Sequence, residues 1–305
     1  EGEPGDVREI TYHELYRQSN RVANYLESVG VGAGDTVALY MPMVPEVTAI
    51  LYGCFKVGAI AVPIFSGFGT EATATRIADS EASVLFTGDG FYRRGSPIRL
   101  KADADAAIEA AGHVEHTVVY DRLGETPAGS GEGADGSGTD AGAEARARTD
   151  AEAEIPWNDE RDATWAAAIE TRDPEHDTPA FPSEHEAMLL YSSGTTGTPK
   201  GIVQTHAGSL MQCAKEVYFG FDHKDHDRFF WVSDIGWMMG PWSLIGNHAF
   251  GGTVFMYEGA PDHPEPDRFW EMIDRHGIST FGISPTAIRA LRKHGDEWLE
   301  GHDLS

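Results

Sequence analysis

Cysteine, lysine and long apolar runs are all scarce in this 305-residue sequence. Cys54 and Cys213 are far apart and form no CxxC pair, so the sequence indicates neither a disulfide framework nor a thiolate zinc site. No apolar run approaches the ~18–20 residues that span a membrane. A hydrophobic content of 41% is typical of a globular chain of one or two domains, and argues against general disorder.

Positive charge is also scarce. The sequence has 23 Lys and Arg residues against 49 Asp and Glu residues, which gives a formal net charge of −26. This acidic excess repels phosphate backbones and anionic lipids, so we expect no binding to nucleic acid or to a membrane surface. Acidity with few lysines also favours a halophilic protein, with compositional drift as the alternative.

The first residues, EGEPGDVREITYHEL, are charged and do not begin with Met. They do not form a secretory signal peptide, so we expect a cytoplasmic protein and a chain that is a segment of a longer one. The pattern does not predict an oligomeric state or a mode of regulation.

Apolar and helix-like segments alternate over residues 1–123. Thr11 and Glu14 have the spacing of a capping box, and helical periodicity follows up to Gly30. Such alternation with short turns predicts an α/β subdomain with a mostly parallel sheet and covering helices. The expected helices are 12–29, 45–57, 70–79 and 101–111, and the expected strands are 37–41, 59–65, 83–88 and 116–121.

Residues 124–160 interrupt this alternation. The stretch 124–155 contains seven Gly and eight acidic residues, with no aromatic or large aliphatic residue before its last position. We expect a solvated, flexible insertion or linker. Gly131, Gly133 and Gly136 match GxGxxG, but no strand precedes them and carboxylates fill the gaps, so we reject a dinucleotide site.

The alternation resumes in residues 161–305 and predicts a second α/β subdomain, again with a mostly parallel sheet. Thr205 and Ser284 are the expected caps of two of its helices. The expected strands are 187–191, 201–204, 229–232, 253–257 and 279–283, and the expected helices are 241–249, 266–275 and two that begin at His206 and Pro285.

The most informative segment of this second block is YSSGTTGTPKG, Tyr191 to Gly201, which directly follows an apolar strand. Its glycines let backbone N–H groups approach an anion, its hydroxyls add donors, and Lys200 offsets charge on a leaving phosphate. The composition therefore predicts a phosphate-binding loop.

Two other ligand-binding patterns are excluded. The loop is not a Walker A motif, because its spacing is G-x-x-G-x-x-K and Gly201 follows Lys200 where a Mg²⁺-binding Ser or Thr is needed. The run from His223 to His226 is interpreted as a solvated turn, so we expect no metal ligands in this chain.

The loop is similar to the [YF]-[TS]-S-G-[ST]-T-G-x-P-K-G signature of the adenylate-forming (AMP-binding) enzymes, which include acyl-CoA synthetases, luciferases and peptide-synthetase adenylation domains. The segments ITYHEL, YGCFKVGAIAVPIFSGF, RIADSEASVLFTGDG and DIGWMMG resemble acetyl-CoA synthetases in the same order. The likeness covers nearly all of the chain except 124–160. It implies an incomplete form of the large N-terminal domain of these enzymes.

The resemblance implies an AMP-forming acyl-CoA synthetase, an acid–thiol ligase. A carboxylate attacks the α-phosphate of ATP to give acyl-AMP and pyrophosphate, and the thiol of coenzyme A then displaces AMP. The implied substrates are ATP with Mg²⁺, coenzyme A and a short- or medium-chain acid. By resemblance, Lys200, Thr195 and Thr196 are catalytic. The implied ATP-phosphate-binding residues are Ser192, Ser193, Gly194, Thr195, Thr196, Gly197, Thr198 and Lys200.

The resemblance also implies an acyl pocket and a coenzyme A site. DIGWMMG places Trp237, Met238, Met239 and Gly240 at the acyl pocket and the pantetheine tunnel. The two methionines replace a smaller Val and a Thr of the acetate enzymes, so the acid is left open. Arg93 and Arg94 correspond to a coenzyme A phosphate contact, although an acid, Asp262, stands near another expected contact.

Family motifs that would follow Ser305 complete the ATP site and supply an adenylation lysine. We therefore expect the 305 residues alone to have little synthetase activity, which a pyrophosphate-exchange assay would test. Two alternatives stay open: a non-catalytic truncated remnant, or an adenylating enzyme that transfers its acyl group to a carrier-protein pantetheine. The arginine pair favours free coenzyme A, because carrier-bound pantetheine lacks the 3′-phosphate.

Overall fold

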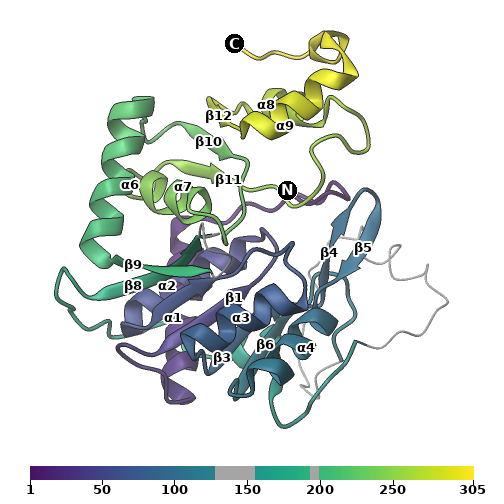
Figure 1. Ribbon diagram of the computed structural model, residues 1–305. Helices are drawn as coiled ribbons and strands as arrows, with labels where there is room; N and C mark the ends of the chain where they lie inside the picture. Colours follow the sequence, from purple (N-terminus) through teal and green to yellow (C-terminus); the bar gives the residue numbers. More distant parts are fainter. Residues whose placement is uncertain (128–154, 193–198) are drawn as a thin grey trace.

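The computed structural model describes residues 1–127, 155–192 and 199–305. Its larger sheet has seven strands in the order β7-β6-β3-β1-β2-β8-β9 (Figure 1). Neighbouring strands are parallel, except that β8 and β9 are antiparallel. The strands are β1 (Thr36–Tyr40), β2 (Ile60–Pro63), β3 (Val84–Gly88), β6 (His116–Tyr120), β7 (Asp162–Thr164), β8 (Glu186–Ser192) and β9 (Lys200–Thr205).

Helices cover both faces of this sheet, as β1 demonstrates. Val37 and Leu39 belong to the core shared with α1 and α2, whereas Ala38 and Tyr40 belong to the core shared with α3 and α4. Side chains of a strand alternate between faces, so a strand covered on both sides must be apolar throughout. The helices are α1 (Tyr12–Ser28), α2 (Pro45–Val57), α3 (Thr70–Ser80) and α4 (Lys101–Ala111), with a π-helical turn at Ala166–Glu170.

The smaller sheet has the parallel order β11-β10-β12. On one face Trp231 contacts Trp242 of α7, with ring centroids 5.0 Å apart. On the other, Phe230 packs edge-to-face on Phe269 of α8 at 5.7 Å. The elements are α6 (His206–Phe221), β10 (Arg228–Trp231), α7 (Met239–His248), β11 (Thr253–Phe255), α8 (Arg268–His276), β12 (Thr280–Gly282) and α9 (Pro285–Leu291), followed by 3₁₀ turns at Arg292–His294 and Asp296–Leu299.

These two mostly parallel sheets with covering helices confirm the predicted fold class. The predicted caps are present: Thr11 and Glu14 form the capping box of α1, and Thr205 and Ser284 cap α6 and α9. β7 was not predicted from the sequence. The predicted domain boundaries stay a prediction. β7, β8 and β9 belong to the predicted second subdomain, and they pair within the larger sheet beside the strands of the predicted first subdomain.

A hairpin of β4 (Gly90–Arg93) and β5 (Ser96–Arg99) also differs from expectation. Its two turn residues, Arg94 (φ 53°) and Gly95 (φ 72°), both have positive φ, as a type I′ hairpin turn requires. The usual Asn-Gly or Asp-Gly signal is absent, so the local sequence does not predict this hairpin. Of the predicted flexible segment 124–160, residues 128–154 lie outside the described part of the chain.

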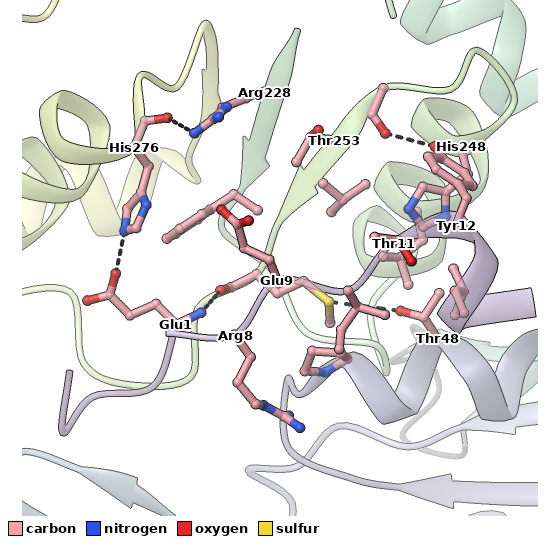
Figure 2. A pocket seen from close by; sticks show the side chains of 18 of the residues that line it. Glu1, Arg8, Glu9, Thr11, Tyr12, Thr48, Arg228, His248, Thr253 and His276 are labelled. Carbon is pink, nitrogen blue, oxygen red and sulfur yellow. Dashed lines mark hydrogen bonds and ion pairs between the residues drawn. The ribbon is translucent and has the colours of Figure 1, made fainter. Parts of the chain in front are cut away.

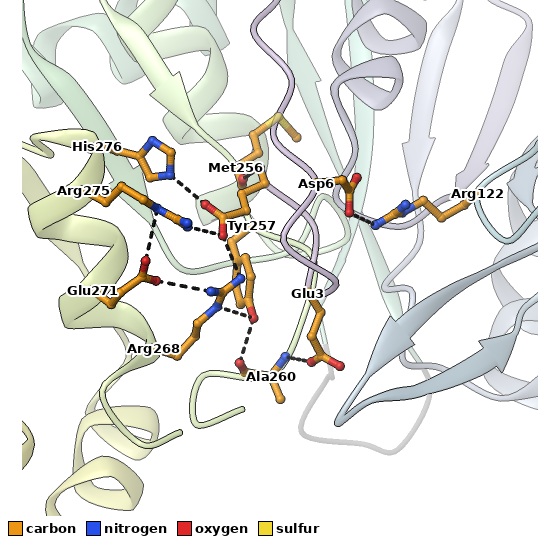
Figure 3. A network of polar contacts seen from close by, with 11 residues as sticks. Glu3, Asp6, Arg122, Met256, Tyr257, Ala260, Arg268, Glu271, Arg275 and His276 are labelled. Atoms are coloured by element: carbon orange, nitrogen blue, oxygen red, sulfur yellow. Dashed lines mark hydrogen bonds and ion pairs between the residues drawn. The ribbon is translucent and has the colours of Figure 1, made fainter. Parts of the chain in front are cut away.

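Residues near the start of the chain link the two sheets through carboxylates (Figure 3). The buried Glu1 carboxylate lies 2.7 Å from Arg268 Nη2 and 2.7 Å from His276 Nε2, both on α8. Asp6 pairs with Arg122, just after β6, at 3.0 Å. These contacts hold the segment between α8 and the end of the larger sheet.

Candidate active site

The predicted phosphate loop connects β8 to β9, the antiparallel pair at one edge of the larger sheet. Ser192, partly buried, lies opposite Lys200, which is exposed. The predicted residues between them, 193–198, lie outside the described part of the chain. The predicted loop follows the carboxyl end of β8. Because β8 is parallel to β2, this end lies beside the carboxyl end of β2.

Tyr191 anchors the strand that leads into this loop. Its hydroxyl donates a hydrogen bond to Asp79 Oδ2 of α3 at 2.6 Å, and the guanidinium of Arg76 lies 5.6 Å from its ring centroid. Burial and the neighbouring carboxylate raise the pKa of Tyr191, so the phenol stays protonated at neutral pH. Both partners belong to α3, so their contacts with Tyr191 hold the end of β8 against this helix.

A cavity of about 1010 Å³ lies where segments that follow parallel strands of both sheets converge. In open α/β sheets, ligands bind outside the carboxyl ends of the strands, and this cavity occupies such a place. The residues of these segments that line the cavity are Pro42 and Met43 after β1, Phe65, Ser66, Gly67 and Phe68 after β2, Ser233, Asp234 and Trp237 after β10, Met256 and Tyr257 after β11, and Ile283 and Ser284 after β12.

Asp234 joins the two sheets at the edge of this cavity. Its Oδ2 accepts a hydrogen bond from the Ser66 hydroxyl at 2.6 Å, and its Oδ1 accepts one from the Gly236 N–H at 2.8 Å. A Cβ on Gly236 would lie 2.0 Å from the backbone nitrogen of Phe65, so only glycine fits this close approach. The loop after β10 is therefore docked directly on the loop after β2.

The replacement Asp234→Asn is expected to raise stability at neutral pH. Burial raises the pKa of Asp234 to about 6, although the Ser66 and Gly236 hydrogen bonds oppose this. Because the folded-state pKa lies above the ordinary value of 3.8, the contribution of Asp234 to stability is fully present below about pH 4 and is lost as pH rises through 6. Asparagine carries no charge, so we expect a gain of up to about 3 kcal/mol at pH 7.5.

Urea unfolding of both proteins between pH 4 and 7.5 measures this difference. The gain should shrink towards zero at pH 4, where the native aspartate is protonated. A gain that does not change with pH would contradict the assignment of the effect to a buried carboxylate.

The structure brings two of the four predicted acyl-pocket residues to the cavity. Trp237 and Met239 line it, and Trp237 packs on Phe65 with ring centroids 5.4 Å apart. Met238 is 38% exposed and does not line the described cavity. Gly240 does not line the described cavity either, and a Cβ there would come within 2.2 Å of the Asp234 carbonyl oxygen.

Most of the cavity wall was not predicted from the sequence. Its large aromatic side chains come from separate segments, and no local pattern distinguishes them from ordinary core residues. Only Phe65, Phe68 and Tyr257 lie in loops that follow the ends of parallel strands, which meet at a common edge, so only these three had a sequence position that could have indicated the cavity. These aromatic residues are Phe65, Phe68, Phe91, Phe230, Trp231, Phe255, Tyr257 and Phe269.

The predicted arginine pair lies at the tip of the β4–β5 hairpin. Arg93 lines the cavity and donates a hydrogen bond to the Gly259 carbonyl at 3.2 Å. Arg94 forms an ion pair with Asp262, with 2.8 Å between Nη2 and Oδ1. Both arginines therefore face the loop that follows β11.

A second cavity, of about 490 Å³, lies between residues 7–12 and the smaller sheet (Figure 2). Tyr12, Thr48 and His248 line it, and the hydroxyl of Tyr52 lies 2.8 Å from His248 Nδ1. Burial lowers the pKa of His248 to about 4, which keeps its ring neutral at physiological pH. No predicted site residue lines the described part of this cavity.

Within residues 1–127, 155–192 and 199–305, no group of three or more His, Cys, Asp or Glu side chains is arranged to hold a metal ion. His223 is buried while Asp225 and His226 are exposed, so the run from His223 to His226 does not converge. Cys54 and Cys213 are buried and unpaired with each other. In the described part of the chain, no helix is both long and apolar enough to cross a membrane.

Comparison with known proteins finds similar sequences over the whole chain. Acetyl-coenzyme A synthetase of Streptomyces coelicolor is 40% identical over 307 residues, which cover 100% of this chain and 43% of the relative. The acetyl-coenzyme A synthetase of Pyrobaculum aerophilum is 40% identical over 308 residues, 100% of this chain and 42% of the relative. The chain thus spans less than half the length of these relatives.

A solved structure is also similar. Acetoacetyl-CoA synthetase from Streptomyces lividans superposes with a TM-score of 0.82 at 28% sequence identity, covering 100% of this chain and 42% of that structure. The family model described as AMP-binding enzyme matches residues 3–305. Since this match extends over almost the whole chain and includes both sheets and the residues that line the cavity, the chain belongs to the AMP-binding enzyme family.

Proposed function

We propose that the full-length protein activates a short- or medium-chain carboxylic acid with ATP and transfers the acyl group to coenzyme A. The observation that carries this proposal is the cavity at the carboxyl ends of both sheets. The predicted phosphate loop joins β8 to β9 and begins at the carboxyl end of β8. The β4–β5 hairpin contributes Arg93 to the cavity wall. Membership of the AMP-binding family supports the reaction class.

In this proposal each wall of the site has a separate task. The loop that ends at Lys200 binds the β- and γ-phosphates of Mg²⁺-bound ATP. Its lysine offsets the negative charge of pyrophosphate as this group leaves. The aromatic wall around Trp237 surrounds the apolar part of the acid and the pantetheine arm. Arg93 and Arg94 bind the 3′-phosphate of coenzyme A.

The net negative charge of the chain opposes the binding of anionic substrates, so local positive charge is needed where they bind. The chain carries a net charge of −26, which repels ATP and coenzyme A at long range. Local cations at Lys200, Arg93 and Arg94 oppose that repulsion where the anions bind. High salt screens the remaining repulsion, which is consistent with the proposed halophilic, cytoplasmic setting.

A panel of acids tests the proposal on the full-length protein. The acids are acetate, propionate, butyrate, hexanoate and acetoacetate, the last because the similar solved structure is an acetoacetyl-CoA synthetase. With ATP, Mg²⁺ and coenzyme A, at least one acid should yield AMP and acyl-CoA in equal amounts. Acid-dependent pyrophosphate exchange without a coenzyme A thioester would favour transfer to a carrier protein. Absence of any acid-dependent AMP would contradict the proposal.

A further inference from the structure

Asp262 forms an ion pair with Arg94, one of the two arginines that the proposed function assigns to coenzyme A. Asp262 Oδ1 lies 2.8 Å from Arg94 Nη2, and Oδ2 accepts a hydrogen bond from the same nitrogen at 3.1 Å. His294 Nε2 lies 3.6 Å from Asp262 Oδ2. A carboxylate therefore already binds the guanidinium that an arriving phosphate would need.

The backbones on both sides of this pair are fixed. The buried Glu3 carboxylate accepts hydrogen bonds from the Gly95 N–H at 2.7 Å and the Ala260 N–H at 2.6 Å, and Figure 3 shows Glu3 beside Ala260. Glu258 accepts another from the Tyr92 N–H at 2.5 Å. The hairpin tip and the loop after β11 are thus held together, which keeps Arg94 beside Asp262.

The two members of the pair differ in their access to solvent. The Asp262 side chain is 17% exposed, whereas the Arg94 side chain is 59% exposed. An anion from solvent therefore reaches the guanidinium without moving the backbone. Because a guanidinium binds carboxylate and phosphate in the same planar geometry, the phosphate competes directly with Asp262.

We propose that Asp262 is an internal competitor for Arg94 and sets the discrimination of this site for nucleotide ligands that carry a 3′-phosphate, as coenzyme A does. The proposal rests on the proposed function for the identity of that ligand. Phosphate binding exchanges one ion pair for another, so the net gain from the 3′-phosphate is reduced by the energy of the Arg94–Asp262 pair. Removing the carboxylate should strengthen binding only of ligands that have this phosphate.

The test compares Asp262→Asn with the native full-length protein by calorimetric binding of adenosine 3′,5′-bisphosphate and of 5′-AMP, followed by KM values for coenzyme A and dephospho-coenzyme A. The asparagine variant should bind the bisphosphate about two- to fivefold more tightly, as expected for release of a partly exposed ion pair. Its KM for coenzyme A should fall by a similar factor. Affinity for 5′-AMP and the KM for dephospho-coenzyme A should not change.

Glu265→Gln is the matched control, because it removes the same charge from an exposed position in the same loop. An equal gain in both variants would overturn the proposal in favour of general charge repulsion, and unchanged or weaker bisphosphate binding in Asp262→Asn would overturn it outright. The double variant Asp262→Asn, Arg94→Gln should lose the gain. If the protein forms no acyl-CoA, the proposed function fails, whereas the calorimetric comparison still decides the role of Asp262.

Discussion

Replacing Lys101 with alanine is expected to lower the free energy of unfolding by about 3–5 kcal/mol, the usual cost of removing one partner from a buried ion pair. The Lys101 side chain is fully buried at the start of α4. Its Nζ lies 2.7 Å from Asp105, 2.8 Å from Asp162 and 2.9 Å from the Pro156 carbonyl oxygen. Without this ammonium the buried Asp162 carboxylate loses one of its two charged partners and keeps Arg161 and the Asn158 N–H as hydrogen-bond donors.

The expected loss is large because this cluster joins segments on either side of residues 128–154. Asp105 belongs to α4, whereas Pro156 and Asp162 follow that stretch, and Asp162 begins β7 at the edge of the larger sheet. Losing the lysine should therefore weaken the attachment of β7 as well as the charge balance.

Urea unfolding followed by circular dichroism measures this effect. Lys215→Ala is the matched control, because Lys215 is exposed on α6 and its Nζ donates to Gln212, so a change within about 0.5 kcal/mol is expected. A loss below about 1 kcal/mol in Lys101→Ala would show that the cluster contributes little to stability.

Replacing Lys200 with alanine is expected to reduce acid-dependent pyrophosphate exchange by the full-length protein about 10²-fold, the usual effect of removing one electrostatic donor at a charge-developing site. Lys200 is exposed at the first position of β9, opposite Ser192 at the end of β8. The strand pair thus presents the ammonium where the predicted phosphate loop returns to the sheet. The expected effect is mainly on kcat, because the charge on the leaving pyrophosphate grows in the transition state.

Lys224→Ala provides the control, since Lys224 is partnered by Asp222 in the turn before β10, outside this hairpin. Exchange should be close to normal in that variant. Normal exchange in Lys200→Ala would contradict the role of Lys200, and an equal fall in both variants would point to a general effect of net charge.

Local sequence patterns predicted most helices and strands because their signals are short-range. A capping box needs only Thr11 and Glu14, and the phosphate-loop composition is complete within eleven consecutive residues, Tyr191 to Gly201. The β4–β5 hairpin escaped prediction because Arg94 and Gly95 turn without the usual Asn-Gly signal, although both have positive φ. Its stability comes from distant carboxylates such as Glu3 and Glu258.

The sequence by itself determined the α/β class, the caps and the motifs by which the family resemblance was identified, because periodicity, caps and motifs depend on neighbouring residues. Only the tertiary structure decided which segments converge at the cavity, that Asp234 meets Ser66, and that Asp262 binds Arg94, residues separated by 168 positions in both cases. Such pairings follow from strand order and from packing across the sheets. A linear pattern does not encode them locally, because each partner could equally be a solvated side chain.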